Sequence, residues 1–208
     1  MNPFLSIWKA PKATVKYLIE HKTIGYGLII MMIASLGPGI MTFADTFFLE
    51  GFSLPAILAI SIGAALILSI PGYFISAFAY TWIGKLLGGT GNWREMCLVI
   101  AGGGLLMIWT LPISILAVIL YGKTLFTYPE DIFAVTNMSP GFYFLYTVIL
   151  MGLSIFGIVV QSKGIGLVHN ISALRGFGTI LIYAGFVFVL VFTIAVAVAV
   201  MSGILFMG

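Results

Sequence analysis

Few residues of this chain carry side chains that do catalytic chemistry, and their spacing matches no catalytic pattern. Cys97 is a potential nucleophile, but only one basic residue lies near it, so we interpret it as a small packing residue. His21 and His169 are too far apart in the sequence to indicate a metal site. The acidic pair Glu130-Asp131 follows a proline and indicates a solvated turn. We therefore expect no catalytic residues, no metal and no cofactor.

A glycine-rich stretch, Gly88-Gly89-Thr90-Gly91, has some likeness to a phosphate-binding loop. It lacks the GxxxxGK[ST] signature, and no strand is expected before it, so we interpret it as a tight return between helices. The basic residues are spread along the chain and do not form the dense patch that nucleic-acid binding needs. An intramembrane enzyme would need Ser, His or carboxylate groups clustered at one cavity, and the sequence does not indicate such a cluster.

The composition points to a membrane protein. Of the 208 residues, 62% are hydrophobic and only 7% are charged, with a net charge of +3. A soluble domain carries about 25% charged residues. So few charges exclude a soluble globular enzyme, the apolar content excludes disorder, and the single cysteine excludes a disulfide scaffold. We therefore expect an all-α integral membrane protein.

Five apolar stretches are long enough to cross a bilayer, which takes about 20 residues in a helix. None of them alternates in hydrophobicity as the strands of a membrane β-barrel do. The sequence therefore predicts five transmembrane helices in a domain over residues 24–208, after a short cytoplasmic segment over residues 1–23. The predicted spans are residues 24–44, 54–83, 96–120, 142–161 and 177–207.

Eight of the nine Lys and Arg residues fall on one side of the predicted membrane. They precede the first span, or lie between the second and third spans or between the fourth and fifth. Because cytoplasmic segments carry the excess of Lys and Arg, we expect a cytoplasmic N-terminus and an extracytoplasmic C-terminus in the plasma (inner) membrane. The first span has a long apolar core, so we expect a retained signal anchor and no cleaved leader.

The N-terminal segment is amphipathic. Pro3 and Pro11 interrupt it, so the best helix is predicted over residues 12–21, with Val15 and Leu18 on its apolar face. We expect this helix to lie in the membrane interface, with its apolar face in the acyl boundary and its lysines toward anionic headgroups. It acts either as a lipid-sensing or partner-docking arm, or simply as an anchor that orients the first span. The residues assigned to the membrane surface are Trp8, Lys9, Lys12 and Lys16.

Three spans contain proline, which removes a backbone hydrogen bond from a helix. Many transporters build substrate sites from broken helices, but prolines also serve kinks and close packing in membrane helices. No charged side chain lies in the middle of a span, as proton-driven transport usually requires. The small-residue stripe Ser61, Ala65 and Ser69 fits either packing within the chain or a homodimer seam. The residues assigned to helix breaks and a cavity are Pro38, Pro71, Gly72, Thr110, Pro112 and Ser114.

Three stretches resemble the Yip family of Ypt/Rab-interacting membrane proteins. Residues 80–95, YTWIGKLLGGTGNWRE, resemble that family's LLGGxGxF/W junction between helices. Residues 2–14 resemble the NPxxSIWxxPxxT opening of bacterial members, and residues 166–175 resemble a third recurring stretch. Pro112 also sits where the family often has a proline. The resemblance covers essentially the whole chain and suits a bacterial-type short member.

The resemblance implies a non-enzymatic adaptor. Eukaryotic members bind small GTPases through a long cytosolic region, which this chain lacks, so GTPase binding is not expected. Some bacterial relatives assist ABC-type exporters and envelope defence.

We therefore expect a membrane adaptor or scaffold that associates with itself or with another integral membrane protein of the transport or envelope machinery. The expected partners are the bilayer and such a protein, and no nucleic acid. The alternative function is a carrier or channel for a small or lipidic molecule.

We assign partner or headgroup contact to residues of the two predicted cytoplasmic loops, which the Yip-like stretches span. The competing interpretation is that these residues only set helix ends and topology. The assigned residues are Gly88, Gly89, Gly91, Trp93, Arg94, His169, Asn170, Ser172 and Arg175.

Overall fold

The computed structural model describes residues 1–131 and 133–207, with side chains described up to residue 200 except at residue 199. Gly208, the end of the predicted domain, and the side chains at the end of the fifth span lie outside the described part. About 80% of the chain is helical, and the described residues contain no strand. Within them, five segments are long and apolar enough to cross a membrane, which confirms the all-α, five-span prediction.

The helices run further than the apolar stretches predicted, because a helix does not have to end where the hydrocarbon ends. The fourth helix continues eight residues past the predicted span, to His169, so Lys163 lies on a helix and the following turn is only residues 170–172. The spans are α3 (Ile24–Met41), α4 (Leu54–Leu86), α5 (Trp93–Met107) with α6 (Thr110–Tyr121) and η1 (Gly122–Phe126), α7 (Pro140–His169) and α8 (Ala173–Met207).

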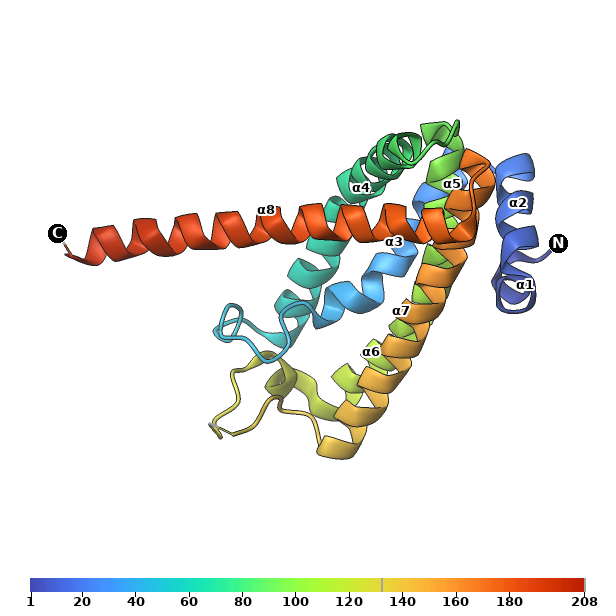
Figure 1. Ribbon diagram of the computed structural model, residues 1–208. Coiled ribbons are helices and arrows are strands. Elements are labelled where there is room, and N and C mark those ends of the chain that lie inside the picture. The colour runs from blue at the N-terminus through green and yellow to red at the C-terminus, as the bar shows by residue number, and fades with distance from the viewer. Residues whose placement is uncertain (132, 208) are drawn as a thin grey trace.

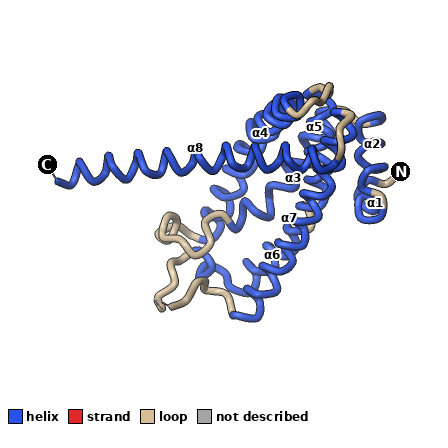
Figure 2. Tube along the Cα trace, viewed as in Figure 1, coloured by secondary structure: helices blue, strands red, loops and turns tan. Residues whose placement is uncertain are grey.

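Helix α5 is the centre of the bundle. Every residue from Met96 to Leu106 is buried, and α5 packs against α2, α3, α4 and α7. Three successive glycines, residues 102–104, let side chains of three neighbouring helices approach this helix closely. Figure 2 shows the result, with helices grouped around α5 and the loops gathered at the two ends of the bundle.

The N-terminal segment forms two helices, α1 (Pro3–Lys9) and α2 (Pro11–His21), each with proline in its first turn. Proline fits there because the missing N–H has no helical partner, so Pro3 and Pro11 begin helices and do not interrupt one. Both helices lie beside α5 and α7 (Figure 1).

The apolar face of α2 contacts protein, and our expectation that it enters the acyl boundary is wrong. Val15 and Leu18 are fully buried against α5 and α7. The physical reason is that α5 and α7 present glycines to Val15, which lets α2 approach them closely. A β-carbon would lie 3.0 Å from Val15 at Gly102 and 3.2 Å from it at Gly164. The residues assigned to the membrane surface remain exposed, and that assignment stays a prediction: Trp8, Lys9, Lys12 and Lys16.

Helix α8 has two parts. The docked part, residues 173–183, lies against α7 and α4, where Tyr183 meets the edge of the Tyr80 ring and its hydroxyl lies 3.2 Å from that of Ser76. The projecting part, residues 184–207, extends away from the other helices (Figure 1). All residues from 184 to 198 are exposed.

The loops at the end of the bundle away from α2 bind each other. The Asp45 carboxylate accepts a hydrogen bond of 2.7 Å from the backbone of Asn137, and the Asp45 N–H donates to the Leu125 carbonyl at 2.9 Å. Asp45 has a left-handed backbone with φ of 56°, which aspartate tolerates better than most residues. These contacts connect α3, η1 and the segment that leads into α7.

Candidate functional site

The two loops assigned to partner contact meet at one end of the bundle. The Thr90 N–H donates to the His169 carbonyl at 3.2 Å, and the Gly91 N–H donates to the imidazole Nδ1 of His169 at 3.0 Å. His169 is fully buried. Because Nδ1 accepts a hydrogen bond, it carries no proton and the imidazole is neutral in this arrangement. We call residues 87–92 and 169–172 together the loop junction.

The imidazole of His169 fits the loop junction because the residues around it are glycines. A β-carbon at Gly84 or Gly89 would overlap the ring, and one at Gly91 would lie 2.9 Å from the Val168 carbonyl oxygen. Of these neighbours, Gly84 was outside our predicted set, although its four-residue spacing from Gly88 was visible in the sequence. The glycines therefore serve close approach, in which Gly84 of α4 packs against the last residue of α7.

Two residues of the loop junction have a positive φ. Gly88 has φ of 88°, which suits the return between α4 and α5. Asn170 has φ of 55° in the left-handed region, and its N–H donates to the Gly166 carbonyl, which ends α7. The left-handed conformation of Asn170 keeps the turn between α7 and α8 short.

Burial separates the predicted contact residues into three groups. His169 and Gly91 are buried, so our expectation that they contact a partner directly is wrong, because they bind each other across the junction. Gly89 and Trp93 are half-buried, and Trp93 stacks on Phe78 with the ring centroids 5.1 Å apart. The exposed members, for which partner contact stays a prediction, are Gly88, Arg94, Asn170, Ser172 and Arg175.

The loop junction joins helices and carries no arrangement that indicates catalysis. The second imidazole nitrogen of His169 is buried and has no hydrogen-bond partner among the described residues. Across residues 1–131 and 133–207, no three His, Cys, Asp or Glu residues lie together as a metal site would require. What the junction does present to its surroundings is positive charge, since Lys85, Arg94 and Arg175 are exposed around it.

The prolines of α3 and α4 do not break their helices, so that expectation is wrong. Pro38 and Pro71 lie inside continuous helices, and both side chains are exposed on the outside of the bundle. Gly72 is also exposed, and a β-carbon there would meet nothing within 4 Å. The packing of neighbouring helices therefore does not depend on Pro38, Pro71 or Gly72.

The third span is interrupted at residues 108–109, between α5 and α6. Pro112 lies in the first turn of α6, where a missing N–H costs little. The Thr110 hydroxyl donates to the Met107 carbonyl at 2.6 Å, and Ser114 is buried. Pro112 lines an open apolar groove together with Trp8, Trp109, Ile113, Ile149 and Leu153. The carrier or channel alternative stays a prediction.

We expect Pro71→Ala to leave the thermal unfolding temperature unchanged or to raise it. Alanine favours a helix interior more than proline does, and no neighbour packs against this exposed position. Thermal unfolding of the purified protein in detergent measures this. A fall of several degrees would contradict the outward placement of Pro71.

The small-residue stripe on α4 is used within the chain. A β-carbon at Gly39 of α3 would overlap the side chain of Ala65 and lie 3.5 Å from the carbonyl oxygen of Ser61. The Ser69 hydroxyl donates to the Leu66 carbonyl in its own helix at 2.8 Å. Ser61 and Ala65 therefore pack against α3, as the first of our two interpretations predicts.

The five apolar spans and the helical bundle around α5 define a multi-pass helical membrane protein. The sequence model of the Yip1 domain family matches residues 5–207 of this chain. The chain therefore belongs to the Yip family. This confirms the resemblance carried by the opening residues and the two loop stretches. Comparisons with curated proteins and with solved structures found no match.

Proposed function

We propose that this protein is a non-enzymatic membrane adaptor that binds another integral membrane protein, or a second copy of itself, through the projecting part of α8. One observation carries the proposal: all residues from 184 to 198 are exposed, although the same helix begins firmly packed against α7 and α4. At 35 residues α8 is about 52 Å long, well beyond the roughly 30 Å of hydrocarbon.

The side chains of the projecting part suit contact with another helix. Gly185 and Thr193 are small residues two turns apart on one side of the helix, where another helix can approach closely, and Val189 lies between them. Phe188 and Phe192 lie on a neighbouring side, with 70% and 61% of their surfaces exposed and their rings stacked on each other. Helices associate in lipid mainly through packing of this kind.

We further propose a cytoplasmic N-terminus, an extracytoplasmic C-terminus and a place in the plasma (inner) membrane. The distribution of Lys and Arg supports this orientation. Arg94 and Arg175, exposed beside the loop junction, would then face cytoplasmic headgroups or a partner's acidic surface. The partner class that fits is a component of transport or envelope machinery, as in some bacterial relatives of this family.

Photo-crosslinking in native membranes tests the proposal. A photoreactive amino acid at Phe188 of α8 is compared with one at Ile67 of α4, which is similarly exposed, at 70%. We expect a discrete protein adduct from position 188 and none from position 67, and mass spectrometry then identifies the partner. Lipid adducts alone at both positions would contradict the proposal.

A further inference from the structure

Three lysines from two helices gather where α2 passes α7. Lys12 and Lys163 line the same two cavities, and Lys16 lines one of them. Lys16 has an acidic neighbour, Glu20, with 3.7 Å between its Nζ and the Glu20 Oε1. Within the described residues, no carboxylate lies within 4 Å of Lys12 or Lys163. Two lysines that line one cavity repel each other through their ammonium groups, and an anion between these groups would offset that repulsion.

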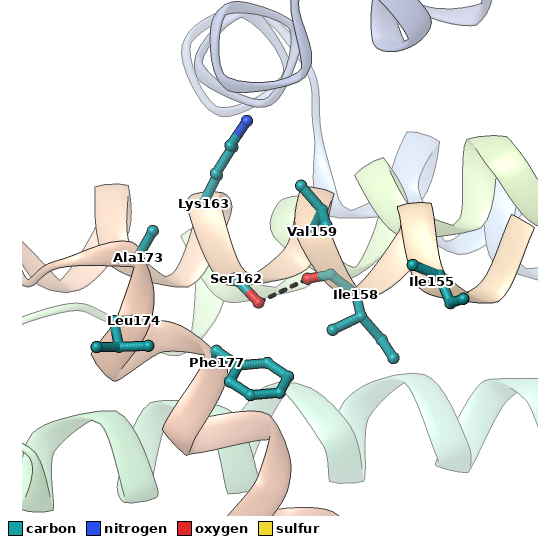
Figure 3. A pocket seen from close by; sticks show the side chains of 8 residues that line it. All are labelled: Ile155, Ile158, Val159, Ser162, Lys163, Ala173, Leu174 and Phe177. Carbon is teal, nitrogen blue, oxygen red and sulfur yellow. Dashed lines mark hydrogen bonds between the residues drawn. The ribbon is translucent and has the colours of Figure 1, made fainter. Parts of the chain in front are cut away.

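Lys163 also lines an apolar groove between α7 and α8, and its ammonium group points away from Leu174 and Phe177 on the other side of the groove (Figure 3). The groove has a volume of about 510 Å³, within the range of sites that hold small molecules. The hydroxyl of Ser162 donates to the Ile158 carbonyl of its own helix, so the groove wall is apolar below the lysine. The other lining residues are Ile155, Val159, Ala173, Leu174 and Phe177.

Along α7, the groove leads from Lys163 toward the apolar part of the helix, which is the direction that a lipid tail would require. Ile155 lies eight residues before Lys163, which is about 12 Å along a helix. Residues 155–159 belong to the apolar stretch predicted to span the hydrocarbon, whereas Lys163 lies just beyond its end. The ammonium groups are thus at the level of headgroups, and the groove leads from them into the acyl region.

We propose that this groove binds one anionic phospholipid. Its phosphate lies between the ammonium groups of Lys12 and Lys163, with Lys16 alongside, and one acyl chain lies along Ile158 and Phe177. The charge of the groove mouth and the apolar wall below it match the two ends of such a lipid. The site uses the docked part of α8, so it does not depend on partner binding by the projecting part.

The test counts the lipids that stay bound to the protein. The protein is reconstituted in nanodiscs of phosphatidylcholine with phosphatidylglycerol. Native mass spectrometry then measures the mass of the protein released from the nanodiscs together with the lipids that it retains. We expect one retained phosphatidylglycerol on the wild type. Each of Lys12→Gln and Lys163→Gln should lower its relative affinity about five-fold, and both together about 25-fold. Lys163→Arg should retain the lipid, and Lys123→Gln, an exposed lysine outside this cluster, should have no effect.

A second variant tests the groove independently of charge. Val159→Trp places a large ring in the groove, and we expect it to reduce phosphatidylglycerol retention while the thermal unfolding temperature stays close to that of the wild type. Equal retention of the two lipids, no loss in the double lysine variant, or complete displacement by inorganic phosphate would overturn the proposal. So would a protein segment crosslinked in the groove in place of lipid.

Discussion

His169→Ala is expected to lower the free energy of unfolding by about 3 kcal/mol, among the largest effects of any single substitution in this chain. The substitution removes a fully buried ring and leaves a cavity bounded by Gly84 and Gly89. It also leaves the Gly91 N–H without its acceptor at Nδ1. Unfolding of the purified protein in mixed micelles, followed by circular dichroism, measures the loss.

Two further variants show whether the loss comes from the loop junction. His169→Asn keeps an acceptor near the position of Nδ1, so it should recover part of the lost free energy. His21→Ala removes an exposed histidine and should change the free energy of unfolding by less than about 0.5 kcal/mol. If His169→Ala behaved like His21→Ala, the buried contact between the two loops would not exist as described.

Gly176→Leu is expected to separate α8 from α7 and to lower the free energy of unfolding by about 3 kcal/mol or more. A β-carbon at Gly176 would overlap the Ser162 carbonyl oxygen and lie 3.1 Å from the Gly166 nitrogen. These are backbone atoms, so no side-chain rotation relieves the overlap. Gly176 thus sets how closely the docked part of α8 lies against α7.

The matched control for that change is Gly185→Leu in the projecting part of the same helix. A β-carbon at Gly185 would meet nothing within 4 Å, so the bundle itself should unfold as in the wild type. Thermal unfolding and limited proteolysis of the two variants in detergent make the comparison. Equal stability of the two would show that α7 and α8 do not cross at Gly176.

The spans were predictable because the bilayer imposes a length and a composition on each helix. The helix ends were not, because a helix continues wherever its backbone hydrogen bonds continue. Residues 162–169 therefore read as loop in the sequence but belong to α7. The Yip-like stretches contain both segments of the loop junction. The contact between Gly91 and His169, which are 78 positions apart in the sequence, depends on how the helices pack.

The wrong predictions for α2 and for the prolines of α3 and α4 have one physical cause. A sequence pattern shows which residues share a face of a helix, but it does not show what covers that face. The apolar side of α2 would look the same against lipid as against protein, and the glycines of α5 and α7 decided the outcome. The prolines of α3 and α4 likewise gave no sign that their rings point outward. Lys163 is one basic residue in its own helix, and its neighbourhood with Lys12 exists only in the folded chain.

The central claim is that the projecting part of α8 binds another membrane protein or a second copy. The most direct test is the mass of the complex extracted from native membranes in nanodiscs, measured for the wild type and for Val189→Trp and Ile67→Trp, two exposed positions on α8 and α4. We predict a stoichiometric second chain with the wild type and Ile67→Trp, and its loss with Val189→Trp. A single chain accompanied by lipid alone in all three samples would contradict the claim.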